Sequence, residues 1–274
     1  NNKKISVREM GYIKLKNIIH PQQIYKIYID SASYESESDK QLHQYLINHG
    51  INIVDMETFS IEQTFSMGIL YINNLGSEND ESIAYNLTND IISDCEYINE
   101  LRTTSFNDIL EYKKSDLSKS DIGRKLEVDN VLKGSILKNN EEIQLSFDLI
   151  NINEGKVLWN EKWSELIINN KKIRKQILQS IIAKFNIDMP SSLENLYSEE
   201  ITHNSEALEI YYKGKYFSDN LNSKDNLNKA RGHLQSAIDM DSKFVEAYSE
   251  FALILHRLGQ FDSAESNLQI ALSI

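Results

Sequence analysis

The residue types that most often carry catalysis or bind metals are thinly spread along this chain. Its histidines are scattered, with no paired spacing to cysteine or carboxylate residues of the kind a zinc site needs. They are His20, His43, His49, His203, His233 and His256. His43 and His49 are six residues apart, which puts them on different faces of a helix. The sequence therefore predicts no metal-binding residue.

Phosphate loops and nucleophilic triads do not emerge from the sequence either. The segment "LKGSI" carries one glycine, Gly134, inside a strand pattern, and it lacks the helix start that a phosphate loop requires. Gly134 is better explained by close backbone approach or a bulge. No Ser-His-Asp arrangement follows from the spacing. We expect no catalytic residue and no cofactor-binding residue in this chain.

Composition and charge narrow the class of partner. The chain has 274 residues and a net charge of -12, which disfavours nonspecific binding to nucleic acid or to an anionic membrane. The single cysteine, Cys95, falls on the apolar side of a predicted helix and indicates a core residue. No run approaches the ~20 apolar residues of a membrane span, and no signal peptide opens the chain. We expect a cytoplasmic protein with no nucleic-acid partner and no membrane span in this chain.

The first 62 residues divide into a strand pair and a linker. Residues 1–30 contain two strand patterns, and two strands cannot bury their apolar faces alone. We therefore expect them either to be disordered or to pair with another segment of this chain or with another chain. Residues 31–62 are predicted to be a linker with one amphipathic helix from about Ser38 to His49, followed by a short strand in "INIVDM".

Residues 63–188 alternate strand and helix patterns. The run "SMGILYINNLG" suits a buried strand, and a helical pattern follows it. The segments "NVLKGSIL", "EIQLSFDLININ" and "KVLWNEKWSEL" are separated by short turns, which predicts an antiparallel meander. Between these regions lies a short helix with Ser120 or Asp121 as its expected N-cap. The predicted fold class is α+β, with a mixed α/β module that contains an antiparallel meander.

The C-terminal part of the chain has helical periodicity only. A linker over residues 189–204, marked by Pro190, precedes helix patterns at about 205–218, 224–239, 243–258 and 261–274. The last two patterns repeat the spacing of small and large residues in the first two. Residues 205–274 therefore indicate a pair of repeated helical hairpins.

The second hairpin resembles the tetratricopeptide repeat family. The residues that match are Tyr248, Phe251, Ala252, Leu255, Leu258, Gly259, Phe261, Ala264, Leu268 and Ala271. The first hairpin matches more loosely, through Ile210, Gly214, Phe217, Ala230, Leu234 and Ala237. The resemblance implies all-α tetratricopeptide hairpins with a concave groove that binds a protein partner. The groove residues it implies are Tyr212, Lys215, Glu246, Ser249, Glu250, His256 and Arg257.

The middle segment resembles the TolB-like amino-terminal module. The residues that carry this resemblance are Gly123, Leu126, Val128, Val131, Leu132, Gly134, Ser135, Leu158 and Trp159. The usual proline of the first strand and the usual Asp-Gly before the first helix are replaced in this chain. The resemblance implies a TolB-like α/β module over residues 63–188 that acts as a spacer or a sensor.

The front of the chain resembles the closing hairpin of class III adenylate and guanylate cyclase catalytic domains. The matching residues are Gly11, Leu15, Lys16, Asn17, Ile18, Pro21 and Tyr25. The order of the three modules then implies the C-terminal part of a bacterial class III cyclase, with residues 1–30 as the closing strands of an incomplete catalytic domain. The parent enzyme would need Mg or Mn, but the residues that hold these metals belong to upstream parts of the catalytic domain. The resemblance thus implies no catalytic residue and no cofactor in this chain.

Three hypotheses of function follow from these resemblances. The leading one is a noncatalytic regulatory and protein-interaction region of a nucleotide cyclase, acting in cyclic-nucleotide signalling, with the repeats as docking site. The second is the adenylate or guanylate cyclase itself, which converts ATP or GTP to a cyclic nucleotide. The third is a small-ligand sensor module, which a large apolar pocket within residues 63–188 would favour.

The last helix pattern reaches Ile274 with no polar capping helix behind it. Repeat arrays normally finish with such a helix, because each repeat leaves an apolar face for its neighbour. We therefore expect the array to be truncated here and the chain to self-associate through that face.

Overall fold

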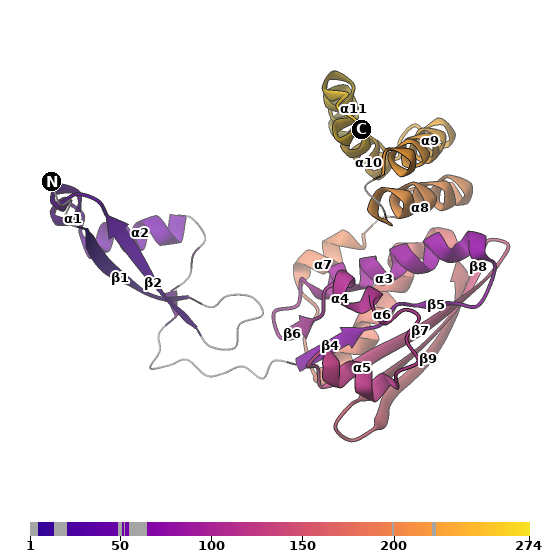
Figure 1. The fold of residues 1–274 in the computed structure, drawn as a ribbon, viewed down its shortest axis with the longest axis horizontal. Helices are drawn as coiled ribbons and strands as arrows, with labels where there is room; N and C mark the ends of the chain where they lie inside the picture. The colour runs from indigo at the N-terminus through magenta and orange to yellow at the C-terminus, as the bar shows by residue number, and fades with distance from the viewer. Residues whose placement is uncertain are drawn as a thin grey trace. The chain divides into compact units, whose positions relative to one another are not determined.

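A computed structural model shows a mixed α+β protein, which confirms the predicted fold class at this level (Figure 1). The structure describes residues 5–13, 21–48, 51, 53–54, 65–198, 200–220 and 223–274. The chain separates into two compact units, the first ending at residue 64 and the second running from Phe65 to Ile274.

The described part of the first unit contains a three-stranded antiparallel sheet in the order β2-β1-β3. Strand β1 (Ser6–Ile13) pairs with β2 (Gln22–Tyr28), and its end pairs with the short β3 (Ile53–Val54). A bulge in β1 places Gly11 at a φ of +107°, a backbone conformation that favours glycine. The helices α1 (Ser31–Ser36) and α2 (Asp39–Asn48) follow β2. The opening strands therefore find their third strand in the "INIVDM" segment.

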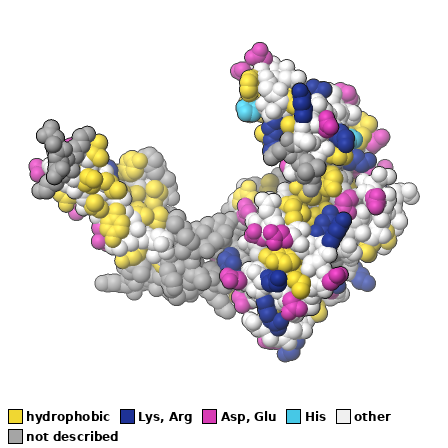
Figure 2. Space-filling view, in the orientation of Figure 1, with side chains coloured by type: hydrophobic (Ala, Val, Ile, Leu, Met, Phe, Trp, Pro, Cys, Tyr) yellow, Lys and Arg dark blue, Asp and Glu magenta, His cyan; other side chains and the backbone are white. Residues whose placement is uncertain are grey.

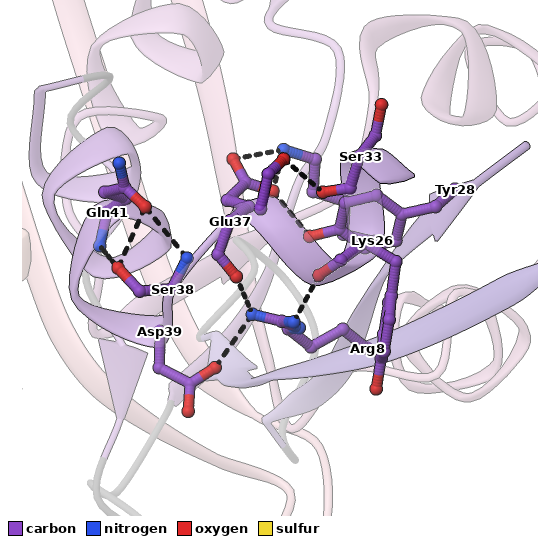
Figure 3. A network of polar contacts seen from close by, with 10 residues as sticks. Arg8, Lys26, Tyr28, Ser33, Glu37, Ser38, Asp39 and Gln41 are labelled. Atoms are coloured by element: carbon purple, nitrogen blue, oxygen red, sulfur yellow. Dashed lines mark hydrogen bonds and ion pairs between the residues drawn. The ribbon is translucent and has the colours of Figure 1, made fainter. Parts of the chain in front are cut away.

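A polar network around Glu37 joins the strands to the segment between α1 and α2 (Figure 3). The Lys26 ammonium and the Tyr28 hydroxyl donate to Glu37 Oε2 at 2.7 and 2.5 Å. The Arg8 guanidinium donates to the backbone oxygens of Glu37 and Tyr34 at 2.5 and 2.7 Å. The hydrogen bonds from Lys26 and Tyr28 hold the pKa of Glu37 below its usual value.

Protonation of Glu37 should therefore weaken the first unit. Because the folded-state pKa is lowered, the stabilising contribution is present above the unfolded value near 4.5 and is lost as pH falls through the folded pKa. Amide hydrogen exchange of β1 and β2, corrected for intrinsic rates, should accelerate as pH falls below 4.5. Glu37→Gln should show the faster exchange already at neutral pH.

The matched control for this variant is Glu35→Gln. Glu35 is exposed and stands in the same segment, so its neutralisation should leave the exchange of β1 and β2 unchanged. Equal effects of the two substitutions would show that the network around Glu37 does not hold the unit together.

The described part of the second unit contains a six-stranded mixed sheet whose main path is β6-β4-β7-β8-β9. Strand β4 (Phe65–Ile69) lies between two parallel neighbours, β6 (Leu101–Thr103) and β7 (Asn130–Asn139). The short β5 (Asn73–Asn74) also pairs parallel with β7. Strands β8 (Glu142–Asn151) and β9 (Lys156–Leu166) continue antiparallel, which confirms the predicted meander.

Helices cover both faces of the sheet near β4 and β7. One face carries α3 (Glu81–Cys95) and α6 (Asn170–Phe185), which share one large apolar core with β4, β7 and β8. The other face carries α5 (Lys119–Lys125), whose Ile122 packs with Leu70 and Val131 in a smaller core. The short α4 (Phe106–Leu110) precedes α5. Single turns of 3-10 helix, Glu78–Asp80 and Ile167–Asn169, precede α3 and α6.

The structure tests two local expectations, the N-cap of α5 and the role of Gly134. The N-cap of α5 is Ser118, whose hydroxyl accepts from the Asp121 amide, so the expectation of Ser120 or Asp121 was wrong. At Gly134 in β7, an added Cβ would lie only 2.5 Å from Phe147 Cε1. Because Phe147 is fully buried and has little room to yield, close packing explains this glycine, as the sequence indicated.

The regular elements that follow α6 in the described chain are all helices. They are α7 (Ser191–Leu196), α8 (Ser205–Asn220), α9 (Lys224–Met240), α10 (Val245–Arg257) and α11 (Phe261–Ser273). From α8 onward each helix packs on the next, and α8 also packs on α3. The close approach of α8 and α9 requires Gly214, where a Cβ would lie 2.7 Å from Leu234 Cγ.

Candidate protein-docking surface

Helix α8 is anchored to the α/β part of the second unit through α3. Asn86, buried in the middle of α3, donates from Nδ2 to the backbone oxygen of Tyr212 in α8 at 2.9 Å. Nearby, the rings of Tyr85 and Tyr216 meet edge to face with centroids 5.2 Å apart. These contacts place the first C-terminal helix directly against the helix layer of the sheet.

Arg174 of α6 adds a chain of charges to this junction. Its guanidinium donates to Asp94 and Asp90 of α3, with Nε–Oδ2 and Nη1–Oδ2 distances of 2.8 and 3.1 Å. The other carboxylate oxygen of Asp90 lies 3.7 Å from Lys215 Nζ of α8. Burial alone would lower the pKa of Arg174, but the two carboxylates more than offset this and raise it. Charged groups of α6, α3 and α8 thus meet in one cluster.

Two of the predicted groove residues lie at this junction. Tyr212 is only 2 % exposed, and its hydroxyl has no hydrogen-bond partner among the described residues. Lys215 faces Asp90. Both residues therefore take part in the packing of the chain on itself, and their role in binding a partner stays a prediction.

The other predicted groove residues all lie on α10. They are Glu246, Ser249, Glu250, His256 and Arg257. Arg257 donates from Nη1 to the backbone oxygen of Ser218 in α8 at 3.0 Å. His256 instead lies against the ring of Phe261, with centroids 5.2 Å apart. Burial raises the pKa of Glu250. Arg257 therefore contacts α8 and His256 contacts α11, and the binding role of the five residues stays a prediction.

A surface outside this set lies on α11, which repeats the residue pattern of α9 at an offset of 34 positions. The apolar residues that correspond are Leu227 and Phe261, Leu234 and Leu268, and Ile238 and Leu272. In α9 these residues are 9, 0 and 6 % exposed, whereas their counterparts in α11 are 60, 47 and 88 % exposed. The small residues that correspond, Ala230 and Ala264, are buried in both helices.

The difference follows from what covers each helix. Helix α9 packs between α8 and α10, while among the described elements α11 packs extensively on α10 alone. We refer to Phe261, Leu268 and Leu272 as the α11 face. The sequence predicted an uncovered last helix but placed the binding residues on the first helix of each hairpin. The offset between α9 and α11 is the signal that identifies the α11 face.

Within the described ranges, no group of three or more His, Cys, Asp or Glu side chains could hold a metal ion. None of the described helices is both long enough and apolar enough to span a membrane. The absence of catalytic, cofactor-binding and metal-binding residues, like the cytoplasmic location, stays a prediction.

Comparison with known proteins gives structural neighbours only. No family model matches the chain, and no curated protein matches it. The LpoB C-terminal domain from Salmonella enterica is similar over 45 % of this chain and 94 % of its own, with 16 % identity and a TM-score of 0.30. Lipoprotein GNA1162 from Neisseria meningitidis is similar over 44 % and 98 %, with 10 % identity and a TM-score of 0.34. TolB from Acinetobacter baumannii is similar over 44 % and 29 %, with 10 % identity and a TM-score of 0.30.

These neighbours overturn the family that the sequence suggested. They are LpoB C-terminal domains and related lipoproteins rather than cyclase domains, so the assignment to a class III adenylate or guanylate cyclase is wrong. The hypotheses of a cyclase regulatory region and of the cyclase itself fall with it. Strand-pair patterns with glycine and proline at their ends are common to many antiparallel sheets, which is why the match misled. Of the residues that carried it, Leu15, Lys16, Asn17 and Ile18 lie outside the described residues.

Two related expectations are corrected as well. The likeness to TolB is weak and covers less than a third of that chain, so no TolB-type function is assigned to the α/β module. A large apolar pocket in this module would have favoured the small-ligand sensor hypothesis. Two clefts in its described part are lined instead by many charged and polar side chains.

The charge cluster at the junction of α3, α6 and α8 yields a stability prediction. Arg174→Met leaves two partly or fully buried carboxylates, Asp90 and Asp94, without their common cation. We expect the free energy of unfolding to fall by about 3–5 kcal/mol, as for other broken buried ion pairs. Urea denaturation of the full chain, followed by the fluorescence of Trp159 and Trp163, measures it.

Lys184→Met on the same helix is the control. Lys184 is exposed, so its replacement should change the free energy of unfolding by less than about 0.5 kcal/mol. If Arg174→Met lost less than about 1 kcal/mol, the range of surface ion pairs, the cluster would not hold the junction.

Proposed function

We propose that this chain is a protein-interaction module whose α11 face binds an amphipathic helix of a protein partner. The observation that carries the proposal is the exposure of Phe261, Leu268 and Leu272 at positions whose counterparts in α9 are buried. In α9 these positions are covered by flanking helices, and a bound helix would cover them in α11 in the same way. Tetratricopeptide-type stacking of the hairpins α8–α9 and α10–α11 is the finer fold assignment on which this proposal rests.

The size of the α11 face fits one helix. Helix α11 has 13 residues and is therefore ~20 Å long. A face of this length is too small for the roughly 800 Å² per partner that a stable protein dimer buries. Docking of a single amphipathic helix through a few apolar anchors is a common mode of peptide recognition.

Charge favours a basic partner over a second copy of the chain. The charged residues of α11 are Asp262 and Glu265, both acidic. A second copy brings the same acidic residues and a net charge of -12, so two copies repel each other. We therefore commit to a partner helix with Lys or Arg beside its apolar stripe. Self-association, the earlier expectation, becomes an alternative outcome of the test.

The predicted groove residues take a secondary place in this proposal. Glu246, Ser249, Glu250, His256 and Arg257 lie on α10, the helix next to α11, and could contact flanking parts of a bound partner. Tyr212 and Lys215 would be accessible only if α8 moved away from α3.

A suitable probe is a labelled peptide of residues 243–258, which contains α10. In the protein α10 packs on α9, the helix whose apolar residues correspond to those of the α11 face. Fluorescence anisotropy with the full chain should show saturable binding. The peptide carrying Glu246→Lys and Glu250→Lys should bind more tightly, because the α11 face is flanked by acidic residues. Leu268→Asp with Leu272→Asp in the protein should weaken binding by at least about tenfold.

The control pair is Ser263→Asp with Gln269→Asp, which adds the same charge to α11 at exposed positions whose α9 counterparts are also exposed. This pair should change the affinity by less than about twofold, within the usual effect of rim residues. No saturable binding, or equal effects of the two pairs, would overturn the proposal. A stable dimer in light scattering that Leu268→Asp dissolves would replace the partner helix by a second copy.

A further inference from the structure

A second candidate site lies in the α/β part of the second unit, away from α11. The described residues enclose a cleft of about 420 Å³ there. Its lining comes from the segment after β4, from β5, the start of α3, the α4–α5 segment and β7. The residues that contribute its charges are Glu81, Lys113, Lys114, Lys119 and Lys133. A volume of this size accommodates a small organic molecule.

The topology of the sheet explains why a cleft forms at this place. The chain leaves β4 through α3 on one face of the sheet and returns as β6. It then leaves β6 through α5 on the opposite face and returns as β7, on the other side of β4. Connections that leave neighbouring parallel strands on opposite faces open a crevice at the carboxyl ends of the strands. Leu70 and Tyr71, which directly follow β4, line the cleft.

The charge of the cleft is opposite to that of the chain. Four lysines and one glutamate line it, although acidic residues outnumber basic ones by 41 to 29 in the whole sequence. Figure 2 shows Lys and Arg side chains on the face of the second unit where Figure 1 places α4 and α5. Lysines gathered around one concave space repel each other unless an anion enters it.

Two of the four lysines are held by protein groups. Lys113 forms an ion pair with Glu81, and its ammonium lies 4.0 Å from the centre of the Tyr71 ring. The Tyr71 hydroxyl donates to Glu81 Oε1 at 2.7 Å, the same carboxylate oxygen that pairs with Lys113. Lys133 is exposed and lies 3.5 Å from Asp148, which is itself bonded to Asn160.

The other two lysines have no such partner. Within the described part of the chain, Lys114 and Lys119 form neither an ion pair nor a hydrogen bond through their side chains. Both line the cleft, one from the turn after α4 and one from the start of α5. They are therefore available to an incoming anion. Lys133 of β7 lines the same cleft.

We propose that this cleft binds an organic phosphate. The phosphoryl group would accept hydrogen bonds from Lys114, Lys119 and Lys133, because a phosphate dianion offers several acceptor oxygens to separate ammonium groups. Tyr71, Leu70 and Ile109 line the same cleft and give the organic part an aromatic and apolar surface. This site is independent of the α11 face, so either proposal can fail without the other.

Isothermal titration calorimetry of the full chain with inorganic pyrophosphate tests the phosphate contacts directly. The measurement belongs at an ionic strength of about 0.05 M, where exposed charges are weakly screened. We expect saturable binding that Lys114→Gln with Lys119→Gln weakens by at least about tenfold. Lys114→Arg with Lys119→Arg should restore most of the affinity, since arginine also binds phosphate.

Two controls separate this site from general charge effects. Lys162→Gln with Lys184→Gln removes the same charge at exposed positions that do not line the cleft, and it should change the affinity by less than about twofold. Citrate, a carboxylate polyanion, should bind more weakly than pyrophosphate. Absence of pyrophosphate binding, equal loss in both double variants, or citrate binding as tight as pyrophosphate would each overturn the proposal.

Discussion

The cluster of Asp90, Asp94, Arg174 and Lys215 is the constraint on which the arrangement of the second unit depends. It joins α3, α6 and α8, which are far apart in the sequence. Moving these charges out of water is unfavourable unless each is paired, so the helices that carry them have to keep their relative positions. The hydrogen bond from Asn86 to the backbone oxygen of Tyr212 adds a buried, directional contact to the same junction.

This junction decides which surfaces remain for partners. Helix α8 packs on α3, and α9 and α10 each lie between two other helices. Among the described helices, α11 is the one whose apolar face is exposed. The cleft lies elsewhere in the second unit, at the carboxyl end of β4. There the connections from β4 and β6 leave on opposite faces of the sheet. The proposed protein-docking face and the proposed anion-binding cleft thus occupy separate parts of the second unit, and each has a distinct chemistry.

Much of the secondary structure could be predicted because its signals are local. The alternation of Ile143, Leu145, Phe147 and Leu149 predicted the buried face of β8, and all four are buried. Helical spacing placed α8 to α11 within two residues of their observed ends. The cap of α5 was missed by two or three positions, since several Ser and Asp residues stand together there and any of them suits an N-cap.

The sites depend on contacts that a sequence pattern does not contain. Asn86 and Tyr212 are 126 positions apart, so the engagement of α8 with α3 was not foreseen. The lysines of the cleft come from three segments that only the crossover through α5 brings together. The family assignment failed for a related reason, because a short strand pair carries too little information to identify an enzyme domain.

Native-state hydrogen exchange of α3 and α8 tests most directly whether α8 is fixed on α3 as part of one cooperative unit. If it is, the slowest amides of the two helices should open with free energies that agree within about 0.5 kcal/mol, and both should respond alike to low concentrations of denaturant. If α8 opened on its own, at a free energy more than about 2 kcal/mol below that of α3, the junction would not be the constraint described.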